Sequence, residues 1–339
     1  MLNTPPFLTA FRPWLIGLTM AGYLLVYFCF QHYLPEKWFL DSGKLASIAG
    51  QGVFEDNSFG MTAWLLNLLP DGLWYVLIPL FGCLTIYALA GRSQTWSTLG
   101  GSLLVLAPTL LLNHLVPSKE TIVIALSLLV MSVIDRWPRL TNIILIVVLA
   151  YLIYGLNVRS YYVLILLVFL LLITLRFMPW RGFVLLGFVA LLGLLFIPPD
   201  VFWALQGQRD TANYYATYIN QSDIRTGFEN PFEPTSAWAF VLNYLYAGFV
   251  LTFPLVLFVS LKEIIMLACV WFCGWMCWWG MRQSQVYIYG PSCLFLAHIL
   301  VLWLFEPDFG SYLRHFSSVL LYLAPAVATF SWRREATVS

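Results

Sequence analysis

Two stretches of the sequence are apolar at every position. The chain reads VLILLVFLLLI from Val163 to Ile173 and VLLGFVALLGLLFI from Val184 to Ile197. Neither stretch alternates apolar with polar residues, as membrane β-strands do, so both predict helices without a water-facing side. A helix needs roughly 20 apolar residues to cross the hydrocarbon layer of a bilayer, and similar runs recur along the chain. The sequence therefore predicts an all-α, polytopic membrane protein.

The composition of the chain supports this prediction and excludes a soluble enzyme. Of 339 residues, 61% are hydrophobic and only 10% are charged, whereas a soluble domain carries about 25% charged residues. The net charge of +1 says little, because a bilayer divides the charges between two compartments. We expect residues 1–339 to form one integral membrane domain.

The order of apolar runs and polar breaks predicts about ten transmembrane helices. The expected spans cover residues 13–30, 72–91, 97–116, 121–134, 141–156, 161–176, 183–198, 263–281, 284–304 and 316–331. The first run follows Arg12 and has no small-residue cleavage site after Phe30, so we expect it to remain as an anchor.

The distribution of Lys and Arg predicts the orientation of the chain. Placing both termini in the cytoplasm puts the basic turns on the cytoplasmic side, as the positive-inside rule requires. Residues 236–262 are apolar enough to cross once more, but that crossing would move Arg282 to the outside. We therefore expect a re-entrant or interfacial hairpin that breaks near Pro254. Two long segments, 31–71 and 199–262, then lie at the outer face.

Four cations stand at the expected starts of helices that run inward from the outer face. These residues are Lys119, Arg159, Lys262 and Arg314. A helix N-terminus already carries a partial positive charge, so a cation there is unfavourable unless an anion answers it. Phosphate recognition combines helix N-termini with Lys and Arg, which makes these residues candidates for binding a diphosphate. The alternative is that they reach lipid headgroups or pair with Glu120, Glu263 or Asp308.

Three acid or imidazole side chains near these cations are candidates for a general base. They are His315, Glu120 and Asp308. A histidine titrates near neutral pH without any shift, and a carboxylate at the interface can accept a proton. The alternative for Asp308 is the start of a helix, and for His315 it is packing at the interface.

The outer segment from 199 to 235 has a composition that suits sugars. It combines amides and charged groups, which bind hydroxyls, with aromatic rings, which cover the apolar face of a sugar. The candidates here are Arg209, Arg225, Tyr214 and Tyr215. As an alternative, any solvated loop is polar, and tyrosine is common at membrane interfaces.

No metal or cofactor is expected. Cys269, Cys273 and Cys277 recur every four residues, but no nearby histidine or acid completes a ligand set, so we expect them to pack in apolar surroundings. The chain carries no phosphate-binding glycine loop and no dinucleotide fingerprint. Nucleotide-driven chemistry and a nucleic-acid partner are therefore not expected.

Four short motifs together resemble a known family. They are Asp41-Ser42-Gly43-Lys44, Pro117-Ser118-Lys119-Glu120, Asn157-Val158-Arg159-Ser160-Tyr161-Tyr162 and Arg314-His315. In order and spacing they resemble the Wzy and EpsG-like polymerases of O-antigen, capsule and exopolysaccharide. The resemblance implies an outer-face site in the bacterial inner membrane, and it adds Tyr161, Tyr162, Asp41 and Lys44 to the candidate sugar-binding residues.

The resemblance implies a metal-independent glycosyltransferase that needs no nucleotide sugar. Its substrate would be an oligosaccharide on undecaprenyl diphosphate, transferred onto a second lipid-linked repeat unit, with a chain-length regulator and a flippase as partners. Three alternatives stay open: a transferase that uses a polyprenyl-phosphate sugar, an O-antigen ligase, and a transporter of lipid-linked saccharides. The long segment has no histidine between 199 and 235, which departs from the ligase pattern.

Overall fold

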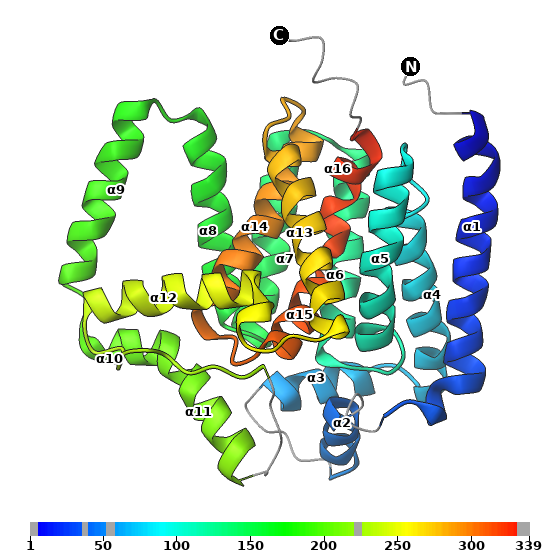
Figure 1. Cartoon of the computed structure of the whole chain (residues 1–339), viewed down its shortest axis with the longest axis horizontal. Helices are drawn as coiled ribbons and strands as arrows, with labels where there is room; N and C mark the ends of the chain where they lie inside the picture. The colour runs from blue at the N-terminus through cyan, green and yellow to red at the C-terminus, as the bar shows by residue number, and fades with distance from the viewer. Residues whose placement is uncertain (1–5, 36–39, 52–57, 220–225, 331–339) are drawn as a thin grey trace. The chain divides into compact units, whose positions relative to one another are not determined.

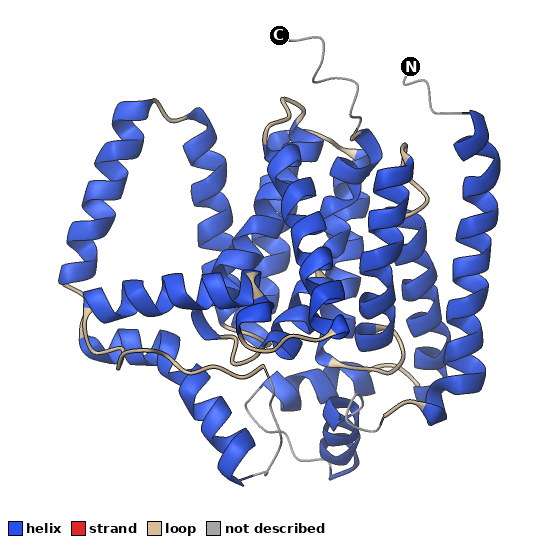
Figure 2. Ribbon diagram, viewed as in Figure 1, coloured by secondary structure: helices blue, strands red, loops and turns tan. Residues whose placement is uncertain are grey.

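The computed structural model describes residues 6–35, 40–51, 58–219 and 226–330, and this part of the chain is built from helices (Figure 2). Its one β-type pairing over those residues is an isolated bridge between Gly227 and Asp308. The all-α prediction is confirmed. The helices divide between two compact units, each of which is described by itself. The prediction of one membrane domain is not tested by this division and stays a prediction.

The first unit comprises 1–166, 273–295 and 317–339. It contains α1 (Pro6–Leu25), α2 (Leu40–Gln51), α3 (Ser58–Asn67), α4 (Asp71–Leu89), α5 (Trp96–Asn113), α6 (Lys119–Arg136), α7 (Leu140–Asn157), the end of α13 (Leu261–Met281), the start of α14 (Val286–Phe305) and α16 (Ala324–Thr329). Helix α4 packs against α1, α5 and α6, and α6 packs against α7. These five helices run side by side (Figure 1).

The second unit comprises 167–272 and 296–316. It holds most of α8 (Tyr161–Phe177), α9 (Trp180–Leu195), α10 (Pro199–Phe202), α11 (Gln208–Tyr214), α12 (Ala237–Thr252), the start of α13, the end of α14 and most of α15 (Phe309–Ser318). Two π-helical turns join α10 to α11 and extend α11, so the chain is helical from Pro199 to Ile219. Helix α12 runs across the direction of α9 (Figure 1).

Six helical stretches in the described part of the chain are long and apolar enough to cross a membrane, or seven if a sharply bent pair is one span. They are Ala10–Tyr33, Gly72–Leu89, Trp96–Asn113, Leu140–Asn157, Leu261–Met281 and Val286–Phe305. The chain is therefore a multi-pass membrane protein. The predicted number of about ten spans is not confirmed, because several predicted spans form shorter helices or carry more charge.

The expected span over 316–331 is wrong as one continuous helix. The chain forms α15 up to Ser318, a one-turn 3-10 helix over Leu320–Leu323, and then α16 from Ala324. Pro325 lies in the first turn of α16. A proline has no backbone N–H and its ring crowds the carbonyl four residues earlier, so the first turn of a new helix is its most favourable position.

Candidate functional site

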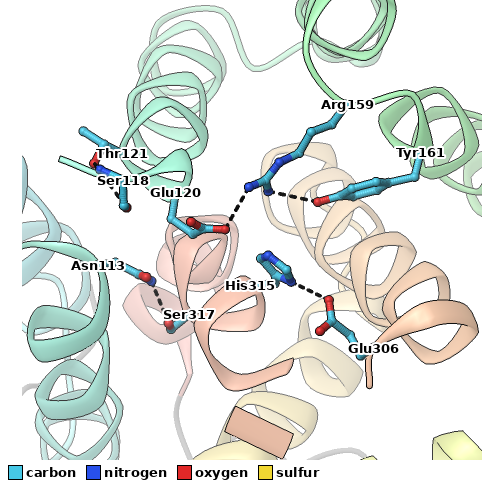
Figure 3. Close-up of polar contacts among 9 residues, drawn as sticks. All are labelled: Asn113, Ser118, Glu120, Thr121, Arg159, Tyr161, Glu306, His315 and Ser317. Atoms are coloured by element: carbon cyan, nitrogen blue, oxygen red, sulfur yellow. Dashed lines mark hydrogen bonds and ion pairs between the residues drawn. The ribbon is translucent and has the colours of Figure 1, made fainter. Parts of the chain in front are cut away.

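Arg159 is the centre of a buried polar group in the first unit. It lies in the short link between α7 and α8, where its backbone N–H donates to the carbonyl of Tyr154. Its Nη2 donates to Oε1 of Glu120 over 3.1 Å, and its Nη1 donates to the hydroxyl of Tyr161 over 3.0 Å. Figure 3 shows the guanidinium reaching both partners. The side chains of Arg159 and Glu120 are 5% and 0% exposed.

Glu120 supplies the counter-charge for Arg159, which is one of the alternatives that the sequence analysis gives for this cation. Glu120 lies in the first turn of α6, where its negative charge also suits the positive end of the helix. Oε1 of Glu120 already accepts from the buried guanidinium of Arg159. Glu120 is thus better placed to hold Arg159 than to serve as the predicted general base.

Tyrosine rings surround Arg159. Tyr162 is 2% exposed, and its ring packs edge-on against Tyr154 at 4.5 Å and lies 5.1 Å from the ring of Tyr161. Tyr151 donates to the hydroxyl of Tyr322 over 2.9 Å. Burial in this cluster gives Tyr162 a packing role, whereas Tyr161 is partly exposed and directs its hydroxyl to Arg159.

Two lysines among the candidate site residues lie over one aromatic ring. Nζ of Lys119 lies 3.7 Å from the ring centroid of Phe59, and Nζ of Lys44 lies 4.3 Å from the same centroid. Such cation–π contacts are worth about 0.5–1 kcal/mol at exposed sites. The structure therefore brings together Lys44 from α2 and Lys119 from α6. Asp41 also belongs to α2, but its side chain lies outside the described residues.

A carboxylate and an imidazole pair in the second unit. Nδ1 of His315, on α15, contacts Oε1 of Glu306, which directly follows α14 (Figure 3). The glutamate side chain is 1% exposed and the histidine side chain 16%. A carboxylate in its ionised form only accepts, so opposite an ionised Glu306 the Nδ1 atom donates, and Nε2 is the acceptor nitrogen of a neutral ring. This arrangement is that of an oriented general base.

Glu306 is a site residue that the sequence did not select. Glu306 precedes Asp308 by two residues in the same turn, and only the three-dimensional arrangement separates the roles of the two carboxylates. Oδ1 of Asp308 accepts from the backbone N–H of Ser311 over 2.9 Å and so caps α15. Burial raises the pKa of Asp308. Asp308 therefore has the helix-start role, and Glu306 has the contact with His315.

The prediction that Arg314 opens the last helix is wrong. Helix α15 begins at Phe309, because Asp308 caps it there, so Arg314 lies inside the helix. The N-terminal electrostatic argument consequently does not apply to Arg314, although it stands next to His315 in sequence. Lys262 does lie in the first turn of its helix, α13, with an exposed side chain and its backbone N–H bonded to Oγ of Ser260.

Arg209 does not have the exposed position expected of a sugar-binding residue. It is 0% exposed. Burial lowers the pKa of Arg209 to about 10, so the side chain stays charged at neutral pH. Its donors bind two backbone carbonyls and one amide side chain. Burial and these bonds give Arg209 a place in the packing of its unit, and its contact with sugar stays a prediction.

The remaining predicted sugar contacts differ in position. Tyr214 and Tyr215 are 54% and 55% exposed, at the end of α11 and the start of the π-helical turn that follows it. Tyr218, one turn further on, is 66% exposed and its ring lies 5.1 Å from that of Tyr214. These exposed rings fit the predicted aromatic platform. Arg225 lies outside the described residues.

No family model, no curated protein and no solved structure matches this chain. The described residues also contain no group of three or more His, Cys, Asp or Glu that could hold a metal ion. Conclusions about function therefore depend on the chemistry of the residues themselves.

Proposed function

We propose that this chain is a membrane glycosyltransferase that polymerises oligosaccharide repeat units carried on undecaprenyl diphosphate at the outer face of the bacterial inner membrane. The observation that carries the proposal is the contact between His315 and Glu306, which orients an imidazole as a base at the end of an apolar membrane helix. The exposed tyrosines of the α11 region and the resemblance of four motifs to Wzy and EpsG-like polymerases support a saccharide substrate.

The proposed step is an inverting transfer. Nε2 of His315 takes the proton of the acceptor hydroxyl, whose oxygen attacks the anomeric carbon of the donor sugar. The bond from that carbon to the phosphate oxygen breaks, and undecaprenyl diphosphate leaves with the electron pair. Glu306 stabilises the imidazolium that forms, as the carboxylate does in other sites where it orients a histidine base.

The leaving diphosphate needs positive charge. We assign this role first to Arg159, whose guanidinium is held in place by Glu120 and Tyr161 and so is preorganised. Lys119, Lys262 and Arg314 are further candidates for the same role. Fixed cations of this kind stabilise a developing phosphate charge without a metal.

We also propose the full threading of about ten spans with both termini in the cytoplasm. Helix α6 carries its four charged residues within its first two and last two positions, and it packs beside α4 and α7, which are long and apolar enough to span. Helices α8 and α9 have 17 and 16 residues, or about 25 Å of rise, so they cross the hydrocarbon layer where the bilayer thins locally. Helix α12 ends at Thr252, just before Pro254, and runs across α9 as an interfacial segment would.

The test is a reconstitution of the purified protein with a synthetic undecaprenyl-diphosphate-linked repeat unit, followed by analysis of the product length. Long products that require His315 support the proposal. A single addition from a polyprenyl-phosphate sugar would instead support a simple transferase, and transfer onto a lipid A core acceptor would support a ligase. Movement of the lipid-linked saccharide between leaflets without a new bond would identify a transporter.

A further inference from the structure

Arg209 binds the end of the helix that carries Glu306. Its Nη2 donates to the carbonyl of Trp303 over 2.6 Å, in the last turn of α14. Its Nε donates to the carbonyl of Glu306 itself over 2.9 Å, and its Nη1 donates to Oδ1 of Asn230 over 2.6 Å. The guanidinium of Arg209 thus binds two backbone carbonyls at the end of α14 and the side chain of Asn230.

The local environment favours a charged guanidinium at this place. The last carbonyls of a helix have no partner within the helix and carry partial negative charge, so a cation that donates to them is favourable. The guanidinium carbon also lies 4.8 Å from the ring centroid of Phe228. Because Arg209 is fully buried, these contacts are made out of water, where hydrogen bonds to a charge are strong.

A second set of bonds holds the partners of Arg209. The backbone N–H and the side-chain amide of Asn230 both donate to the carboxylate of Asp210, each over 2.9 Å. One turn along α11, Nδ2 of Asn213 donates to the carbonyls of Phe228 and Pro307 over 2.7 and 3.1 Å. Side chains of α11 therefore donate to backbone carbonyls before, at and after Glu306.

We propose that Arg209 is the positioning residue of the pair formed by Glu306 and His315. By holding the backbone of Glu306 it fixes the direction in which the carboxylate leaves the chain, and the carboxylate in turn orients the imidazole. This inference rests on the proposed function only for its effect on catalysis, because the geometric part concerns the contact between Glu306 and His315 alone. The sequence makes Arg209 a candidate sugar contact, and this assignment gives it a positioning role.

The first experiment is a double-mutant cycle in the polymerisation assay. Misplacing a catalytic group by about 1 Å costs on the order of 100-fold, so Arg209→Lys should lower kcat by roughly that factor with KM little changed. In a Glu306→Gln background the same change should add less than about a twofold loss, because the two act through one contact. Arg181→Lys, on the exposed start of α9, is the matched control. Additive losses, or an unchanged kcat in Arg209→Lys, would overturn the proposal.

The second experiment reads the geometry without any activity. The chain has four histidines, so ¹⁵N-histidine labelling gives few signals, and His315→Gln assigns the one from His315. The wild-type chain should show a downfield Nδ1 proton that Glu306→Gln removes. Arg209→Lys should weaken or remove this signal, and so should Asn230→Ala, which decides the matter if the arginine variant does not fold.

The two experiments separate the two proposals. An unchanged His315 signal in folded Arg209→Lys and Asn230→Ala refutes the positioning role, whether or not the protein makes polymer. A signal that depends on Arg209, in a protein that makes no glycan, refutes the proposed function and keeps the positioning role.

Discussion

Nη2 of Arg159 donates to Oε1 of Glu120 over 3.1 Å, and neither side chain has more than 5% of its surface exposed. The pair joins the link before α8 to the first turn of α6. Because both charges are withdrawn from water, removing one leaves the other buried without its counter-charge.

Arg159→Ala is expected to destabilise the protein as well as to stop polymer formation. Breaking a buried ion pair by removing one partner costs about 3–5 kcal/mol. The melting temperature of the detergent-solubilised variant should fall accordingly, and Glu120→Ala should behave in the same way. Arg136→Ala, at the exposed end of α6, is the control and should melt as the wild type does. Wild-type melting of Arg159→Ala would contradict the burial argument.

The double variant Arg159→Met with Glu120→Leu separates structure from chemistry. Replacing a whole buried pair by apolar side chains of similar volume is often neutral, so the melting temperature should recover. Polymer formation should stay reduced by roughly 100 to 1,000-fold if the guanidinium stabilises the leaving diphosphate. Recovery of both stability and turnover would show that the pair is structural only and would remove Arg159 from the mechanism.

His315→Gln is expected to lower the rate of polymerisation by about 100 to 10,000-fold, the usual effect of losing a general base. The protein should remain folded and should still bind the lipid-linked repeat. The imidazole side chain is 16% exposed, and its proposed role is proton transfer and not the stability of the fold. His32→Gln, at an exposed histidine, is the matched control. Comparable rates for the two variants at equal protein levels would refute the proposed base.

Asp308 should affect stability through its cap and its ionisation. Its pKa is raised by burial, so the favourable contribution of this carboxyl is present at acidic pH and is lost as the pH rises through the folded-state pKa. Asp308→Asn keeps an acceptor for Ser311 and removes the buried charge, so at pH 7 it should melt no lower than the wild type. Asp308→Ala loses the cap and should be about 1 kcal/mol less stable. Thermal melts at pH 4 and pH 7 test both statements.

The proposed topology predicts the accessibility of single cysteines in a cysteine-free background. A cysteine at Tyr218, which is 66% exposed, should react with an impermeant thiol reagent in intact spheroplasts. A cysteine at Ser284, also exposed but in the proposed cytoplasmic turn, should react only after lysis. A reporter fused after Ser260 should behave as outer-facing. The reverse pattern at Tyr218 and Ser284 would refute the orientation.

The sequence by itself determined the class of the protein, an all-α chain with several helices apolar enough to cross a membrane. Apolar runs such as Val184 to Ile197 exclude a water-facing side, and Pro254 favours the end of α12 at Thr252, because a proline in a helix interior removes one backbone hydrogen bond. These are local properties of composition and backbone, so they can be recognised without any partner.

Tertiary structure alone decided which polar residues meet. Glu120 and Arg159 are 39 residues apart, and Arg209 and Glu306 are 97 residues apart, so their contacts depend on how helices pack and not on spacing along the chain. Glu306 and Asp308 are two residues apart, but only the structure shows that Asp308 caps α15 and that Glu306 contacts His315. A buried charge is stable only beside a counter-charge or several donors, and packing determines where these lie.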